Sequence, residues 1–223
     1  MQQDPAALNA TGFGAEMTAS PGPSDIWLDA RVAYAGRAAE YVAALGDIEG
    51  MSPTDRAKIG AWALSLSGPV LDAGCGPGHW TAHLHDLGVE IAGIDMVTEF
   101  VASARARFPG VTFQEGTLGA LPYPAGALTG ILAWYSLIHA PPEQMPALLA
   151  EFARCLAPGG SLLVGFFDGP RIEAFDHAVT TAYFWPPAEL CRALDSAGFT
   201  VVDVETRTDP GHRPHAAIVA TLR

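Results

Sequence analysis

Basic residues are scarce in this 223-residue chain. Lysine and arginine together number 12 against 24 aspartate and glutamate residues, and Lys58 is the single lysine, so the formal net charge is −12. Proteins that bind nucleic acids or anionic membranes neutralise phosphate groups with lysine and arginine. The charge balance therefore argues against both partners and favours a small molecule that is neutral or cationic.

Cysteines and long apolar segments are also few. Cys75, Cys155 and Cys191 are odd in number and far apart, which implies no disulfide framework. No apolar stretch approaches the roughly 18 residues that span a bilayer. The start Met1-Gln-Gln-Asp-Pro5 lacks the basic and apolar regions of a signal peptide. We therefore expect a cytoplasmic protein.

The segment from Pro69 to Trp80 is the most informative part of the chain. A short apolar run typical of a buried strand leads to Asp72 and then to Gly74, Gly76 and Gly78, and the apolar spacing that follows suits a helix. Glycines between a strand and a helix let the backbone turn sharply and let a ligand approach closely. This pattern indicates a nucleotide-type binding site.

The spacing of the glycines discriminates between ligands. A dinucleotide site uses G-x-G-x-x-G, whereas here the glycines follow G-x-G-x-G and His79 stands where the third glycine would fall. No Gly-Lys-Ser/Thr follows, so a P-loop is also disfavoured. Asp72, directly ahead of the loop, is poorly placed for a diphosphate. It suits the α-ammonium and sulfonium groups of S-adenosylmethionine, which we take as the ligand.

Strand and helix patterns alternate along most of the chain. We expect a flexible arm over residues 1–24 and a single domain over 25–223, which begins with helices in 25–66, the second of them capped by Ser52. The expected elements that follow are strand 70–73, helix 79–87, strand 89–94, helix 98–108, strands 111–114 and 127–133, helix 143–156, strand 161–167, a helix ending at Ala197, and strands 200–206 and 215–222. This order predicts a doubly wound α/β sheet, mostly parallel, with an antiparallel C-terminal hairpin.

Five segments of the chain resemble a known family and occur in its order. The stretch Val70–Gly78 resembles motif I of the class I S-adenosylmethionine-dependent methyltransferases. The other four segments are Ile91–Asp95, Glu115–Leu118, Gly130–His139 and Leu156–Gly165. The resemblance covers roughly residues 56 to 167 and implies a Rossmann-like sheet of seven strands. It is greatest to small stand-alone bacterial members with Trp134-Tyr-Ser-Leu-Ile-His139 in motif IV.

The resemblance also implies a set of cofactor-binding residues. Asp95 would receive the ribose hydroxyls, because a carboxylate at a strand end can accept both protons. Residues 116–118 would flank the adenine, and Asp72 with the glycine loop would hold the amino-acid end. Arg56 either pairs with the cofactor's carboxylate or is an ordinary surface charge. The complete set is Arg56, Asp72, Gly74, Cys75, Gly76, Gly78, Trp80, Asp95, Met96, Gly116, Thr117, Leu118, Ala133, Trp134 and Tyr135.

His139 is the candidate catalytic residue. At the exit of motif IV a histidine can take a proton from a hydroxyl or ammonium at neutral pH, or it can only orient the loop. The acceptor pocket is predicted to involve Tyr34, and His177, Tyr183 and Trp185 from a candidate lid over 168–187, although aromatic lids also occur as packing. No metal site is expected, since nothing completes the spacing of His79, His83 and His85.

The predicted activity is methyl transfer from S-adenosylmethionine to the oxygen or nitrogen of a small molecule, leaving S-adenosylhomocysteine. Two alternatives remain at this point. One is a regulatory protein that binds S-adenosylmethionine without turnover. The other is an NAD-dependent oxidoreductase, which His79 and the terminal hairpin disfavour.

Overall fold

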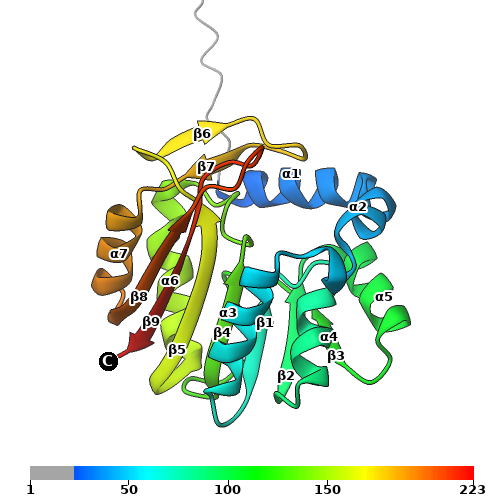
Figure 1. The fold of residues 1–223 in the computed structure, drawn as a ribbon, viewed down its shortest axis with the longest axis horizontal. Helices are drawn as coiled ribbons and strands as arrows, with labels where there is room; N and C mark the ends of the chain where they lie inside the picture. The colour runs from blue at the N-terminus through cyan, green and yellow to red at the C-terminus, as the bar shows by residue number, and fades with distance from the viewer. Residues whose placement is uncertain (1–22) are drawn as a thin grey trace, which may run out of the picture.

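The computed structural model describes residues 23–223 (Figure 1). The predicted flexible arm lies outside the described residues, except for Pro23 and Ser24, which already belong to helix α1 (Pro23–Gly36). None of the helices in the described part is long and apolar enough to cross a membrane.

A seven-stranded sheet forms the centre of the molecule, in the order β3-β2-β1-β4-β5-β9-β8. The first five strands pair in parallel, and β9 pairs antiparallel with both β5 and β8. The strands are β1 (Val70–Ala73), β2 (Ile91–Asp95), β3 (Thr112–Glu115), β4 (Leu128–Trp134), β5 (Leu156–Phe167), β8 (Phe199–Arg207) and β9 (His215–Leu222). The predicted sheet class and its terminal hairpin are confirmed.

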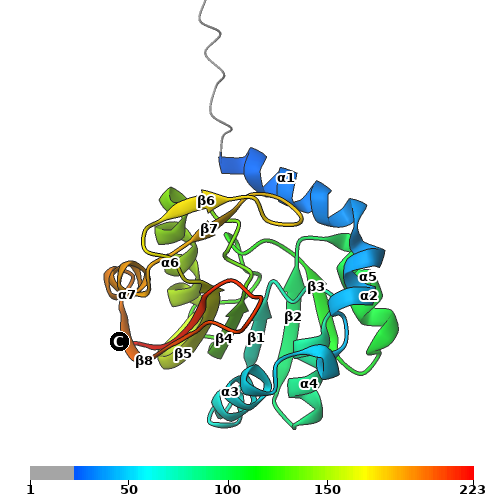
Figure 2. The same ribbon diagram turned by 45° about the horizontal axis from the view of Figure 1, so that its top comes forward.

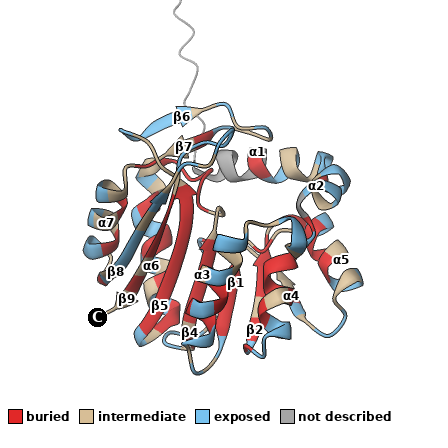
Figure 3. Cartoon of the chain, viewed as in Figure 1, coloured by how far each residue is buried: buried red, intermediate tan, exposed pale blue. Residues whose placement is uncertain are grey.

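Helices cover both faces of this sheet, which is why its central strands are almost entirely buried (Figure 3). Successive residues of β1 point to opposite faces: Val70 packs with side chains of α3 and α4, and Leu71 packs with side chains of α6. Helix α7 joins α6 on its face, and α5 packs on β2 and β3. The bounds are α3 (Pro53–Leu64), α4 (His79–Asp86), α5 (Thr98–Arg107), α6 (Met145–Cys155) and α7 (Pro187–Ser196).

Two segments far apart in the sequence lie over the carboxyl edge of the parallel strands (Figures 1 and 2). One is the pair α1 and α2 (Ala38–Leu45), and the other is the hairpin of β6 (Glu173–Phe175) and β7 (Ala182–Phe184). Short 3-10 turns, Ile48–Gly50 and Pro142–Gln144, precede α3 and α6. The predicted lid segment 168–187 therefore contains a two-stranded hairpin that the sequence pattern did not indicate.

The structure corrects three local predictions. Ser52 holds the N-cap position of α3 but its side chain makes no capping hydrogen bond; Pro53 occupies the first turn, where its missing N–H costs no bond. Helix α3 also ends at Leu64, two residues before the predicted end. Strand β5 begins at Leu156 and includes residues 156–160, which were assigned to a helix end and a turn. The irregular pairing with β4 between Leu128 and Gly130 accommodates the extra residues.

Gly78, at the start of α4, has a structural role that a substitution can isolate. Its φ is +83°, and an added Cβ would lie 2.7 Å from the Phe113 ring and 2.8 Å from the Ala104 side chain. Gly88 has a similar φ of +89° but open space around it. Gly78→Ala should therefore lower the free energy of unfolding by about 2–4 kcal/mol, against about 1–2 kcal/mol for Gly88→Ala, where only the left-handed backbone is penalised. Equal losses in urea denaturation of the two variants would contradict the packing argument.

Candidate active site

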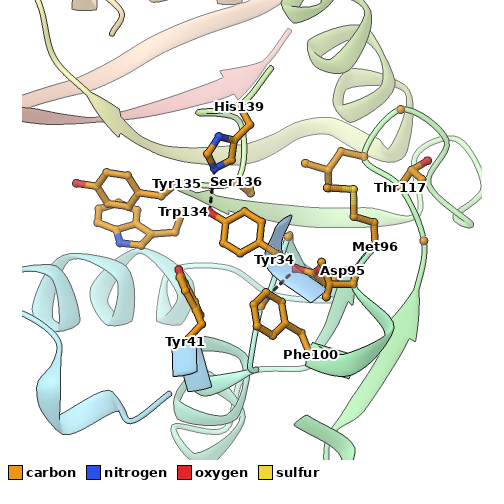
Figure 4. Close-up of a pocket in the computed structure, with 16 residues that line it drawn as sticks. Tyr34, Tyr41, Asp95, Met96, Phe100, Thr117, Trp134, Tyr135, Ser136 and His139 are labelled. Carbon is orange, nitrogen blue, oxygen red and sulfur yellow. Dashed lines mark hydrogen bonds between the residues drawn. The ribbon is translucent and has the colours of Figure 1, made fainter. Parts of the chain in front are cut away.

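A cavity of about 400 Å³ opens at the carboxyl edge of the sheet, beneath α1 and α2 (Figure 4). Its walls come from α1, α2, the β1–α4 loop, the β2–α5 connection, the loop after β3 and the loop after β4. The lining residues are Tyr34, Tyr41, Gly74, Gly76, Asp95, Met96, Val97, Phe100, Gly116, Thr117, Leu118, Gly119, Trp134, Tyr135, Ser136 and His139. A largely apolar cavity of this size with a few convergent polar groups suits a small ligand.

The glycine loop provides an open floor to the cavity. Gly74 and Gly76 both have positive φ, +81° and +53°. An added Cβ at Gly74 would lie 2.3 Å from the Ser136 Cβ, so this glycine permits close contact with the loop after β4. An added Cβ at Gly76 would meet no protein atom within 4 Å. Gly76 therefore leaves room for a ligand to approach the backbone.

The carboxylate of Asp95 lies at the carboxyl end of β2 and is 8% exposed. One oxygen accepts the N–H of Gly76 at 2.8 Å and the other accepts the N–H of Val97 at 2.8 Å. Burial raises the pKa of Asp95, and the backbone N–H bonds partly oppose that rise. Since each oxygen has a second lone pair, the carboxylate can also accept two neighbouring hydroxyl groups.

His139 is held between two segments distant in sequence. Its Nε2 lies 2.8 Å from the Tyr34 hydroxyl, and its Nδ1 lies 2.7 Å from the carbonyl oxygen of Thr181. A carbonyl only accepts, so Nδ1 carries the proton and Nε2 accepts the hydrogen bond that Tyr34 donates. Burial lowers the pKa of His139 and raises the pKa of Tyr34, so both groups are neutral at neutral pH.

Aromatic rings form much of the cavity wall (Figure 4). The Tyr34 ring meets Tyr41 edge to face, with centroids 5.5 Å apart, and lies 5.8 Å from Phe100. On another side the rings of Trp134 and Tyr135 are perpendicular at 5.5 Å. Tyr135 has a φ of +56°, rare for a bulky residue and typical of functional sites.

The structure brings most of the predicted site residues together. Those that line the cavity are Tyr34, Gly74, Gly76, Asp95, Met96, Gly116, Thr117, Leu118, Trp134, Tyr135 and His139. The predicted residues outside its lining are Arg56, Asp72, Cys75, Gly78, Trp80, Ala133, His177, Tyr183 and Trp185.

Several of the second group are buried outside the cavity. Asp72 is 2% exposed and accepts a hydrogen bond from the Thr81 hydroxyl at 2.6 Å. Cys75 packs among buried side chains of α5 and β3, and Trp80 packs in the cluster between α3, α4 and the sheet. Ala133 is fully buried in β4.

The three residues of the predicted lid differ in their surroundings. The centroid of the His177 ring lies 5.3 Å from that of the His139 ring, so His177 packs edge to face against the candidate base. The Tyr183 N–H donates to the Ile138 carbonyl, and Trp185 is a buried core residue. Arg56 projects from α3, and its Nε is buried with no hydrogen-bond partner among the described residues.

Five lining residues escaped the sequence interpretation: Tyr41, Val97, Phe100, Gly119 and Ser136. Tyr41 belongs to a helical apolar pattern that is equally typical of packing. Ser136 stands inside the motif IV segment, and its hydroxyl is buried with no partner among the described residues. Its position within Trp134–His139 was the available signal. In residues 23–223 no three His, Cys, Asp or Glu side chains are grouped as metal ligands would be.

Comparison with known proteins agrees with this geometry. Residues 70–160 match a family model described as a methyltransferase domain. A probable S-adenosylmethionine-dependent methyltransferase of Mycolicibacterium smegmatis is 31% identical over 142 residues, covering 60% of this chain and 52% of the relative. The segment of residues 70–160 is therefore similar to the class I S-adenosylmethionine-dependent methyltransferases.

Further methyltransferases extend the comparison. Trans-aconitate 2-methyltransferase of Methylobacterium nodulans is 38% identical over 111 residues, covering 47% of this chain and 40% of the relative. A Burkholderia thailandensis 1,6-didemethyltoxoflavin-N1-methyltransferase shares the fold, with a TM-score of 0.74, 21% identity and 91% of each chain covered. The chain spans about half the length, or less, of the curated relatives it matches.

The residues present fit S-adenosylmethionine, the methyl donor named for the relative described above. The open space above Gly76 accommodates a ligand without displacing protein atoms. Asp95 retains acceptor capacity for a ribose diol, and the aromatic wall suits a sulfonium through cation–π attraction.

Gly76→Ala should separate binding from folding. The added methyl group enters the cavity, so we expect the affinity for S-adenosylhomocysteine to fall at least about tenfold, with a stability loss close to that of Gly88→Ala, whose φ is also positive. Isothermal titration calorimetry and urea denaturation measure the two effects. Unchanged affinity would contradict the placement of the ligand above Gly76.

Asp72 should make the ligand-free protein sensitive to pH. Burial raises the pKa of Asp72 to about 7, although the Thr81 hydrogen bond opposes the rise. A carboxyl whose pKa is raised on folding contributes stability that is present below its unfolded value and lost as pH rises through the folded value. The wild-type protein should therefore lose stability relative to Asp72→Asn as pH rises from 4 to 8, by at most about 1.4 kcal/mol per pH unit. A pH-independent difference in urea denaturation would contradict the raised pKa.

Proposed function

We propose that this chain transfers a methyl group from S-adenosylmethionine to an oxygen or nitrogen of a small-molecule acceptor. The observation that carries the proposal is the convergence on one cavity of the Gly76 backbone, the Asp95 carboxylate and the Tyr34–His139 pair. The names of relatives agree with a small-molecule acceptor: they include demethylmenaquinone, trans-aconitate and 1,6-didemethyltoxoflavin methyltransferases.

The cofactor would be held at three points. Asp95 would accept the ribose hydroxyls, and residues 116–118 would flank the adenine. The loop of Gly74 and Gly76 would lie against the amino-acid end, with Asp72 beneath it as a counter-charge for the ammonium. Arg56, whose Nε has no partner among the described residues, would serve the carboxylate if its side chain swings toward the loop.

S-adenosylmethionine supplies an activated methyl group on sulfur, so the chain needs no covalent nucleophile. The tasks of the protein are to align the acceptor, exclude water and receive a proton. As the bond from the acceptor atom to the methyl carbon forms and the carbon–sulfur bond breaks, the acceptor's proton must leave. The Tyr34 hydroxyl can take that proton while it passes its own to the Nε2 of His139, 2.8 Å away. His139 is then the base, reached through Tyr34.

The alternative role of His139, orienting the loop through Thr181, can be separated by two substitutions. His139→Asn keeps an N–H donor near the position of Nδ1 and removes the basic Nε2, and Tyr34→Phe removes the relaying hydroxyl. If His139 is the base, each change should lower kcat about 100-fold or more and leave the affinity for S-adenosylhomocysteine within a few-fold. A kcat near the wild-type value in His139→Asn would assign the histidine an orienting role.

The pH dependence of kcat provides a further check. Burial lowers the pKa of His139 below its ordinary value, and the base is active when unprotonated. The rate should therefore stay level from neutral pH upward and fall only in acid, below about pH 6.5. A rate that rises through pH 7–8 would require a different base.

Turnover separates this proposal from a non-catalytic regulatory protein of the same fold. The protein is incubated with S-adenosylmethionine labelled in the methyl group and with small-molecule fractions of a bacterial extract, and labelled products are separated by chromatography. A labelled product that Gly76→Ala fails to form supports catalysis. Binding of S-adenosylhomocysteine without any labelled product would favour the regulatory alternative.

A further inference from the structure

The charge of the cavity wall restricts the acceptor. Among the described lining residues, Asp95 is the only one with a charged side chain at neutral pH, and none is lysine or arginine. The chain as a whole carries a net charge of −12. An anionic acceptor would lose its hydration inside an apolar cavity and would meet a carboxylate instead of a cation.

The basic side chains around the lid are engaged outside the cavity. Arg37 pairs with Glu40 and donates to the Ala178 carbonyl. Arg213 stacks on the Phe175 ring, 4.8 Å from its centroid, and donates to the Asp176 carbonyl at 3.4 Å. These contacts keep positive charge at the rim and away from the lining.

A cationic acceptor is disfavoured for a different reason. The methyl donor itself carries a positive sulfonium, and the reacting atoms must approach to about 3–3.5 Å. A second positive charge at that distance repels the first in a partly desolvated cavity. The sulfonium of the donor would also compete with a cationic acceptor for the electron-rich faces of the aromatic rings. Both signs of acceptor charge are therefore unfavourable.

The remaining surface of the cavity suits a flat ring. Tyr34, Tyr41 and Phe100 form an edge-to-face and tilted cluster, with centroids 5.2–5.8 Å apart, and Trp134 lies on another side of the cavity. Aromatic rings pack on such walls by stacking or edge contact. Within this aromatic wall, the Tyr34 hydroxyl is the polar group that contacts His139.

We propose that the acceptor is an uncharged aromatic or heteroaromatic compound with an O–H or N–H group, its ring packed against Tyr34 and Tyr41 and its reacting group beside the Tyr34 hydroxyl. This inference rests on the proposed methyltransferase function. The new bond joins the acceptor's oxygen or nitrogen to the methyl carbon, the carbon–sulfur bond breaks, and the proton passes through Tyr34 to His139.

Matched ring compounds that differ in charge test the inference. The wild-type chain is saturated with S-adenosylmethionine and given 4-hydroxybenzamide or 4-hydroxybenzoate, 8-hydroxyquinoline or its 5-sulfonate, and tyramine as the cation. Release of S-adenosylhomocysteine and binding in the presence of S-adenosylhomocysteine are both measured. At least one uncharged member should exceed its anionic partner, and exceed tyramine, by about tenfold or more in turnover or affinity.

Equal or reversed preference, or no binding of any uncharged ring compound, would overturn the inference. Binding of S-adenosylhomocysteine alone is measured in the same samples. If that binding is intact while the charge preference fails, only the acceptor class is wrong. If the cofactor product itself does not bind, the proposed function fails as well.

A positive charge introduced at Tyr41 in the cavity wall provides a second test of the acceptor's charge preference. Tyr41→Arg puts a guanidinium beside the ring site, and Tyr41→Gln is the uncharged control of comparable reach. The Arg variant should shift the preference toward 4-hydroxybenzoate by about tenfold relative to the Gln variant. The same preference in both variants would show that the ring does not bind beside Tyr41.

Discussion

The buried carboxylate of Asp95 joins the segments that form the floor of the cavity. Its two oxygens accept N–H groups from Gly76, in the first loop, and from Val97, at the start of α5. Hydrogen bonds to a carboxylate are stronger than neutral ones, particularly when buried. The single side chain therefore fixes the distance between two strand ends and still presents lone pairs to a ligand. Removing it would disturb both the loop geometry and the ligand contacts.

A second connection closes the site from above. Tyr34 in α1, His139 after β4 and Thr181 before β7 form one hydrogen-bonded chain across three parts of the sequence. Arg37 and the Ala178 carbonyl join the same two outer segments. The N-terminal helices and the β6–β7 hairpin are thus tied to each other through His139 and through the contact of Arg37 with Ala178. In the proposed mechanism, closure of the cavity and transfer of the proton depend on the same hydrogen bonds, which suits a reaction that must exclude water.

The sequence predicted the parts of the structure that depend on local patterns. The glycine spacing at Gly74–Gly78, the acid at Asp95 and the alternation of strands and helices predict the sheet and the loop, because each pattern has few other structural uses. Sequence could not separate Gly76, which faces open space, from Gly78, which faces Phe113, since both are glycines of one loop. It also could not show that the side chains of Asp72 and Cys75 are buried outside the cavity lining.

Contacts between residues far apart in the sequence could not be predicted from the local sequence patterns. The Tyr34–His139 hydrogen bond joins residues 105 positions apart, and nothing in the spacing near either residue indicates it. Tyr41 and Phe100 meet at the cavity for the same reason: each belongs to a helical apolar pattern, and only the packing of α2 on α5 turns their rings toward one site. Tertiary packing decides such contacts, and local propensity does not contain it.

Thermal unfolding of the protein with S-adenosylmethionine, S-adenosylhomocysteine and NAD in separate samples tests the central claim, that the cavity is an S-adenosylmethionine site. A ligand at about 100 times its dissociation constant adds roughly 2.7 kcal/mol of stability, which corresponds to a rise of several degrees in Tm for a domain of this size. If the cavity binds S-adenosylmethionine, the Tm should rise with both adenosyl ligands and stay unchanged with NAD. A rise with NAD alone would contradict that claim.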